Sequence, residues 1–145
     1  MSQRARPRLI ESEPLDDELL FETGEPQVLI RGIATVQAQC TAVSKAFYFG
    51  QPKLTFDFKV VNPEEHVGTR LKMFARNAPE WKGHPPVSSK LWKIAAVVLE
   101  RLPRREDRVT QKMFLKKVFK CELGTSGKGV AAYTVVKMIT EKVAG

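Results

Sequence analysis

Cysteine is scarce in this chain, which has two thiols among its 145 residues. Cys40 and Cys121 are too few for a disulfide framework, and neither stands in a C-x-x-C motif or at zinc-ligand spacing from a histidine. We therefore expect both thiols in the protein core and the protein in a reducing compartment, with the cytoplasm as its location. The sequence predicts no metal site and no bound cofactor.

Long apolar runs are also missing. No segment contains the roughly 18 consecutive apolar residues that a membrane-spanning helix requires. Residues 1–8 are polar and basic, and the apolar segment of a signal peptide does not follow them. We expect neither secretion nor a membrane partner.

Nucleotide-binding and catalytic motifs are incomplete. The segment GTSGKG, residues 124–129, has the composition of a phosphate-binding loop, but Glu122 stands where the first glycine of that motif is required. Asp57 and Lys59 form half of a nuclease-like D-x-K arrangement, and no clear partner carboxylate precedes them on a strand. We predict that the protein is not an enzyme, with a metal-dependent nuclease as the less favoured alternative.

Charge is abundant and unevenly distributed. The whole chain carries a net charge of +8, but residues 1–26 contain seven acidic and three basic side chains and carry −4, which leaves +12 on the remainder. Three prolines and a glycine among these charges predict that residues 1–26 form a flexible acidic arm, followed by one folded domain of residues 27–145. A basic domain of this kind attracts a polyanion.

The arm contains one acidic and hydrophobic segment, DDELLF, residues 16–21. Such a segment is suited to occupy the basic surface in competition with nucleic acid, or to recruit a protein partner. A plain solubilising tail is the alternative interpretation.

Alternation of apolar and polar side chains predicts five strands. The first, residues 27–40, is long and is expected to bend at Gly32, because a glycine inside a strand commonly marks a bulge or a bend. The other four are predicted at residues 53–60, 69–76, 118–123 and 131–143. The residues of the second and third strands expected in the core are Leu54, Phe56, Phe58, Val60, Leu71, Met73 and Ala75.

One helix is predicted between the third and fourth strands. Ser88 and Ser89 are candidate N-caps, and apolar residues at helical spacing continue from there to Leu102. A second, short helical turn is predicted within residues 110–116. A mainly β chain of three strands, one helix and two strands has the order of the OB-fold, a five-stranded Greek-key barrel that binds oligonucleotides on strands two and three and on two of its loops.

Two stretches of the sequence resemble one group of proteins. The block FGQPKLTFDFKVVNPEEHVGTRLKMF, Phe49 to Phe74, is similar to a pattern in small proteins of bacterial phages and plasmids: an aromatic-glycine turn, an alternating strand, a Pro-Glu turn and then G-T-x-L. The stretch FLKKVFKCELGTSGKGVAAYTVVKMITEKV resembles their last two strands. The resemblance covers roughly residues 27–143. It implies an OB-like, single-stranded nucleic-acid-binding protein without catalytic residues.

The third strand offers the clearest candidate binding surface. Its polar face combines Arg70, Lys72 and Arg76 with one ring, Phe74. Cations bind phosphates, and an aromatic ring stacks on bases of any sequence. The second strand extends this face with Lys53, Thr55 and Lys59. The alternative is a solvated strand face in which Phe74 is covered by the helix or by the loop that holds Trp81.

Loops supply further candidates for nucleic-acid binding. They are Lys45 and Tyr48 before the first turn, Lys128 in the second turn, and Trp81 as a stacking lid in a proline-rich loop. We expect the other aromatic rings in the core: Phe47, Phe49, Phe56, Phe58, Phe114, Phe119 and Tyr133, with Trp92 packing on the helix.

The sequence therefore predicts a protein that binds single-stranded DNA with little sequence preference, in the replication or recombination of a phage or mobile element. RNA is the alternative ligand. The alternative role is that of a protein-interaction subunit within a larger nucleoprotein assembly. Self-association through exposed strands is compatible with either role.

Overall fold

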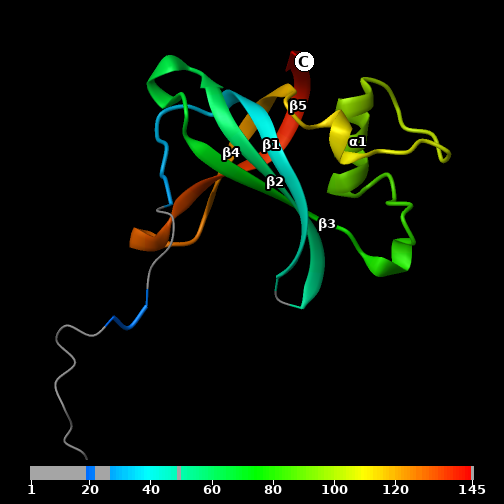
Figure 1. The fold of residues 1–145 in the computed structure, drawn as a ribbon, viewed down its shortest axis with the longest axis horizontal. Helices are drawn as coiled ribbons and strands as arrows, with labels where there is room; N and C mark the ends of the chain where they lie inside the picture. Colours follow the sequence, from blue (N-terminus) through cyan, green and yellow to red (C-terminus); the bar gives the residue numbers. More distant parts are fainter. Residues whose placement is uncertain (1–18, 22–26, 49, 145) are drawn as a thin grey trace, which may run out of the picture.

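Five strands and one α-helix are the main elements of the described part of the chain (Figure 1). The structure is a computed structural model that describes residues 19–21, 27–48 and 50–144, and of Tyr48 it describes the backbone alone. The predicted flexible arm lies outside these residues, apart from Leu19, Leu20 and Phe21. The elements are β1 (Thr35–Tyr48), β2 (Gln51–Asn62), β3 (Arg70–Arg76), α1 (Lys90–Leu99), β4 (Val118–Ser126) and β5 (Tyr133–Ala144). Short 3₁₀ helices lie at Glu64–His66, Pro79–Trp81, Gln111–Met113 and Gly129–Ala131.

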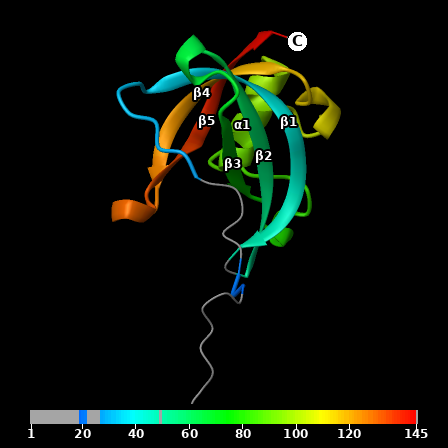
Figure 2. The same cartoon turned by 60° about the vertical axis from the view of Figure 1, so that its left-hand side comes forward.

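The strands form one antiparallel sheet in the order β3-β2-β1-β4-β5. The mainly β fold, its five strands and the helix between β3 and β4 are confirmed. The sheet curls, and its edge strands β3 and β5 approach each other (Figure 2). No ladder joins these two strands within the described residues, so the sheet is not closed.

The free edge of β5 is covered at its start by the segment that precedes β1. Thr134 donates its backbone N–H to the carbonyl of Val28, and the Thr134 hydroxyl accepts the N–H of Ile30, each at 2.7 Å. These bonds satisfy backbone groups that an edge strand would otherwise expose.

The second and third strands follow their predicted alternation. Val60, Phe58 and Phe56 of β2 are buried, as are Leu71, Met73 and Ala75 of β3. The ladder between the two strands is regular from Lys53 opposite Arg76 to Lys59 opposite Arg70. Because the side-chain period of a strand is two, this register places all of their predicted polar residues on one face.

The predicted bounds of the first strand are wrong. Gly32 has a φ of +84° and does redirect the chain, but β1 begins after it, at Thr35, and continues to Tyr48. Within residues 27–34, Val28 bonds to β5 and Ala34 bonds to β4 at separate points, and no ladder forms. A bulge between Cys40 and Ala42 shifts the alternation, which hides the second half of β1 from pattern analysis.

The extended β1 produces a long β1–β2 hairpin. β4 pairs with β1 only from Thr35 to Gln39, whereas β2 pairs with it as far as Tyr48. The second half of β1 therefore has a neighbouring strand on one side only. Figure 1 shows this hairpin projecting from the curled sheet on the side where α1 packs.

The helix begins as predicted and ends early. Ser89 is the N-cap, and its hydroxyl accepts the backbone N–H of Trp92 at 3.1 Å. The helix ends at Leu99, because Glu100 adopts the left-handed conformation with a φ of +59°. Leu102, which was predicted within the helix, lies beyond it and is exposed.

Aromatic pairs fill the centre of the core. The ring centroids of Phe56 and Phe114 lie 5.1 Å apart, and Phe58 meets Phe119 edge-on at 6.3 Å. The prediction that Phe47 is a core residue is wrong, since its side chain is 74% exposed. Tyr133 is half-buried, and Phe49 lies outside the described residues.

Both cysteines lie in the core, as predicted, with free thiols. Burial raises the pKa of Cys40 to about 11 and that of Cys121 to about 12.

Within the described part of the chain, no helix has the length and apolar character needed to span a membrane.

Candidate nucleic-acid interface

The β2–β3 ladder brings the predicted basic residues together. Lys59 pairs with Arg70 at one end of the ladder, and Lys53 pairs with Arg76 at the other. Side chains on one strand face recur about every 6.8 Å, so Arg70, Lys72, Phe74 and Arg76 span about 20 Å. We call this surface the β2–β3 face and define it by Lys53, Lys59, Arg70, Lys72, Phe74 and Arg76.

Acidic side chains engage only part of this face. Lys72 pairs with Asp57, its neighbour across the ladder, at 3.2 Å, and Arg76 pairs with Glu80 at 3.3 Å. All four side chains are substantially exposed, and ion pairs of this kind contribute little because water screens them. A phosphate can therefore replace these carboxylates as the partner of Lys72 and Arg76 at little cost in free energy. No ion pair is recorded for Lys59 or Arg70 within the described residues.

The middle of the face differs from the prediction. Phe74 is half-buried and lies opposite Thr55. Thr55 is only 3% exposed, and its hydroxyl has no hydrogen-bond partner among the described residues. It therefore does not present its hydroxyl to a ligand, although its position on the β2–β3 face is as predicted.

The end of the face near Arg76 gains two further groups. The Arg76 guanidinium lies 5.6 Å from the centroid of the Trp81 ring, so Trp81 adjoins the face at this end and stacks on one of its cations. Burial lowers the pKa of Lys90, and the positive charge of Lys53 lowers it further. Lys90 opens α1, and its proximity to Lys53 extends the basic surface to the helix. No spacing in the sequence indicates this proximity.

Of the other three loop candidates, Lys45 and Tyr48 lie on β1, and Lys128 lies in the connection between β4 and β5. Lys128 is exposed and precedes the 3₁₀ helix between β4 and β5. The backbone of Tyr48 pairs with Gln51 at the end of the β1–β2 hairpin. Lys45 is on β1 opposite Leu54, which places it on the other face of the hairpin from Lys53. The prediction that Lys45 lies in a loop is therefore wrong.

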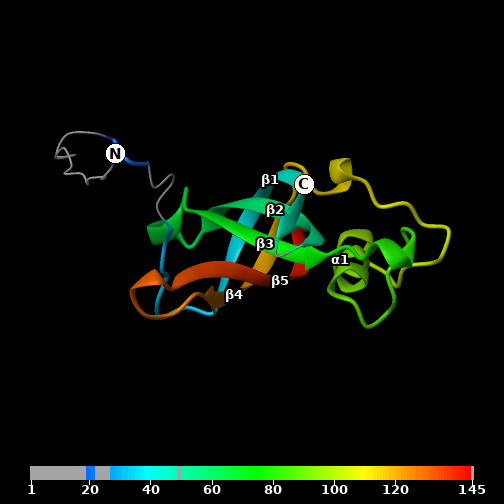
Figure 3. The same cartoon turned by 90° about the horizontal axis from the view of Figure 1, so that it is seen from below.

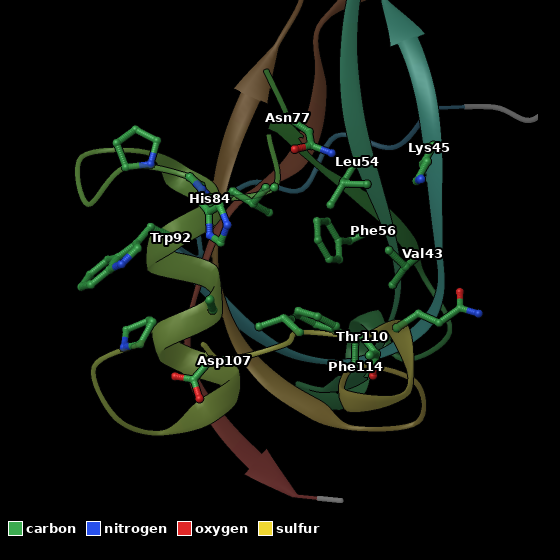
Figure 4. Close-up of a pocket in the computed structure, with 18 of the residues that line it drawn as sticks. Val43, Lys45, Leu54, Phe56, Asn77, His84, Trp92, Asp107, Thr110 and Phe114 are labelled. Atoms are coloured by element: carbon green, nitrogen blue, oxygen red, sulfur yellow. The ribbon is translucent and has the colours of Figure 1, made fainter. Parts of the chain in front are cut away.

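A cleft of about 790 Å³ separates this other face of the hairpin from α1 (Figure 4). Val43, Lys45 and Leu54 approach it from the hairpin, and Leu91 lines it from α1. Phe56 and Phe114 lie at its base. The Trp92 ring points away from the open space, so the walls are mainly aliphatic. The rest of the apolar lining comes from Pro85, Pro86, Val87, Ala95, Pro103 and Val109.

The rim of the cleft is basic. Lys45, Arg104 and Arg105 line it, and Asp107 is the one carboxylate among the described lining residues. Asp107 accepts two hydrogen bonds from the Arg101 guanidinium, at 2.7 and 2.8 Å, and one from the backbone N–H of Arg104 at 2.6 Å. These bonds hold the pKa of Asp107 well below the usual carboxyl range. Its charge is thus already compensated, and the rim retains a positive potential.

Sequence reasoning missed the cleft because its walls come from β1, from β2, from the segment that leads into α1 and from the connector after it. The signal that was available lies in β1, where Val43, Lys45 and Phe47 alternate with Ser44 and Ala46 after the bulge.

Among the described residues, no group of three or more His, Cys, Asp or Glu side chains is placed to hold a metal ion. The chain matches no protein-family model, and no curated protein has a matching sequence.

Proposed function

We propose that the protein binds single-stranded nucleic acid on the β2–β3 face, with little sequence preference and without catalysis. The observation that carries this proposal is the β2–β3 register, which gathers five cations and one aromatic ring on a single strand face. Phosphates would bind the cations, and a base would stack on Phe74. Thr55 takes no part, because it is buried.

The topology supports an OB-like interpretation of this face. The spatial order β4-β1-β2-β3 corresponds to that of a Greek key, and the approach of β3 to β5 suits a partly open barrel. In such a barrel, strands two and three carry the ligand. Single-stranded DNA is the proposed ligand, in replication or recombination, and RNA is an arm of the test.

The test is a titration of labelled poly-dT, duplex DNA and RNA at two salt concentrations. We expect tight, salt-sensitive binding of the single strand. Five phosphate contacts would give a slope of log K against log salt of about −3.5, since each contact to a single strand contributes about −0.7. Binding to none of the three nucleic acids would overturn the proposal and favour a protein-interaction subunit.

A pair of charge-neutralising variants locates the site. Removing two phosphate contacts with Lys59→Gln and Arg70→Gln should reduce the steepness of the salt slope by about 1.4. The control variant removes the same charge at Lys112 and Lys120, which are exposed outside the β2–β3 face. Equal losses in the two variants would show that only net charge matters and would remove the case for this face.

A further inference from the structure

Three large apolar side chains near the N-terminus have no cover. Leu19, Leu20 and Phe21 are 71%, 69% and 74% exposed. Three consecutive exposed side chains of this size form a patch that binding to another surface would remove from water. The sequence directly before them is acidic, with Asp16, Asp17 and Glu18.

The cleft between the β1–β2 hairpin and α1 complements this segment in both respects. Its walls are aliphatic, with Val43, Leu54 and Leu91, which suits leucine and phenylalanine side chains. Its rim is basic, with Arg104 and Arg105 on the connector that follows α1. Among its described lining residues, Phe56 and Phe114 are buried and the Trp92 ring points away from the open space, which leaves the His84 imidazole as the exposed ring. The cleft is therefore less suited to stacking a base than the β2–β3 face is.

The anchor of the N-terminal segment favours docking between two molecules. Val28 is held by Thr134 near the start of β5, whereas Lys142, near the end of β5, pairs with Glu100 after α1 at 2.8 Å. Eight residues of strand, about 26 Å, separate these two points, so Val28 is held at the far end of β5 from Glu100. Figures 1 and 3 show residues 27–34 and α1 on opposite sides of the sheet.

We infer that residues 16–21 of one molecule dock in the cleft of a second copy. The apolar side chains enter the cleft, and the acidic residues face Lys45, Arg104 and Arg105 at its rim. Each copy offers one segment and one cleft on different parts of its surface, so the contact is head-to-tail and generates open chains rather than closed dimers. This inference does not depend on nucleic-acid binding.

Analytical ultracentrifugation of the full chain, without nucleic acid, tests the inference. We expect the parent protein to associate with rising concentration. The variant Leu20→Ser/Phe21→Ser lacks the apolar contact, and Arg104→Glu/Arg105→Glu reverses the rim charge. Each should weaken self-association at least tenfold, whereas Lys112→Glu/Lys128→Glu, which reverses the same charge outside the cleft, should associate more tightly than the rim variant.

A mixture of the two defective variants supplies the decisive result. The rim variant retains an intact segment and the segment variant an intact cleft, so an equimolar mixture can form one contact per pair. We expect heterodimers and no longer chains. A parent protein that stays monomeric at all concentrations would overturn the inference. Self-association of the segment variant equal to that of the parent would also overturn it, because another interface would then be responsible.

Discussion

Phe74 is the residue on which the proposed stacking depends. It lies in the centre of the β2–β3 face, between Lys72 and Arg76 along β3. Replacing Phe74 with Ala should weaken binding to oligo-dT about 5- to 150-fold, which corresponds to the roughly 1–3 kcal/mol that base stacking contributes. Fluorescence anisotropy measures the affinity, and circular dichroism checks that the variant is folded.

The matched control is Phe47→Ala, which removes an exposed ring from the other face of the β1–β2 hairpin. It should leave affinity close to that of the parent. A folded Phe74→Ala protein that binds oligo-dT as well as the parent would refute the stacking role, and the β2–β3 face would then act through charge alone.

Two buried threonines should respond to the same substitution with opposite signs. The Thr55 hydroxyl has no partner, so Thr55→Val removes an unsatisfied polar group and should raise the free energy of unfolding by about 1 kcal/mol. The Thr134 hydroxyl accepts the N–H of Ile30, so Thr134→Val should lower it by about 1 kcal/mol. Urea denaturation measures both. A loss of stability in Thr55→Val would mean that its hydroxyl has a partner in solution.

At the scale of single elements, the connector after α1 depends on one carboxylate. Asp107 joins the Arg101 guanidinium to the backbone of Arg104 and so fixes the loop that carries the cleft rim. Asp107→Ala should speed tryptic cleavage after Arg104 and Arg105 severalfold, because cleavage requires a locally mobile backbone. Mass spectrometry of the early fragments identifies the sites.

The neighbouring variant Glu106→Ala is the control, since Glu106 is exposed and its carboxylate forms no recorded bond among the described residues. It should be cleaved at the rate of the parent. Equal rates in Asp107→Ala and the parent would show that the loop is held by other contacts.

The elements also show what the sequence could predict. β2 and β3 were located correctly because strict alternation fixes both the strand and its buried face, and their antiparallel pairing then places Lys59 beside Arg70. β1 was misplaced because the bulge after Cys40 breaks the alternation while the ladder to β2 continues. The cleft could not be predicted, because it exists only where α1 packs beside the far half of the hairpin. Alternation can be recognised within one stretch of sequence, whereas the packing of a helix beside a distant hairpin cannot.

At the scale of the whole molecule, the uneven charge distribution has two expected consequences. The acidic arm lowers the positive potential of the domain, and this effect reaches about 30 Å at 0.01 M salt but only about 8 Å at 0.15 M. The arm also carries the segment that we propose joins neighbouring copies. The first effect opposes nucleic-acid binding, while the second makes binding along one strand cooperative.

Deleting residues 1–26 should separate these two effects by the length of the oligonucleotide. On an oligonucleotide long enough for one protein, the deletion should strengthen binding at low salt, because the net charge changes from +8 to +12, and the gain should vanish near 0.15 M salt. On a strand several times longer, the deletion should abolish cooperativity, which appears as a lower Hill coefficient.

The control for this deletion keeps the arm and changes Leu20 and Phe21 to Ser, which preserves every charge. It should bind the short oligonucleotide as the parent does and lose cooperativity on the long one, since only the apolar contact between copies has been removed. If the deletion leaves short-oligonucleotide affinity unchanged at low salt, the arm does not compete for the basic surface. If the Leu20 and Phe21 variant remains cooperative, copies meet on the strand through a different surface.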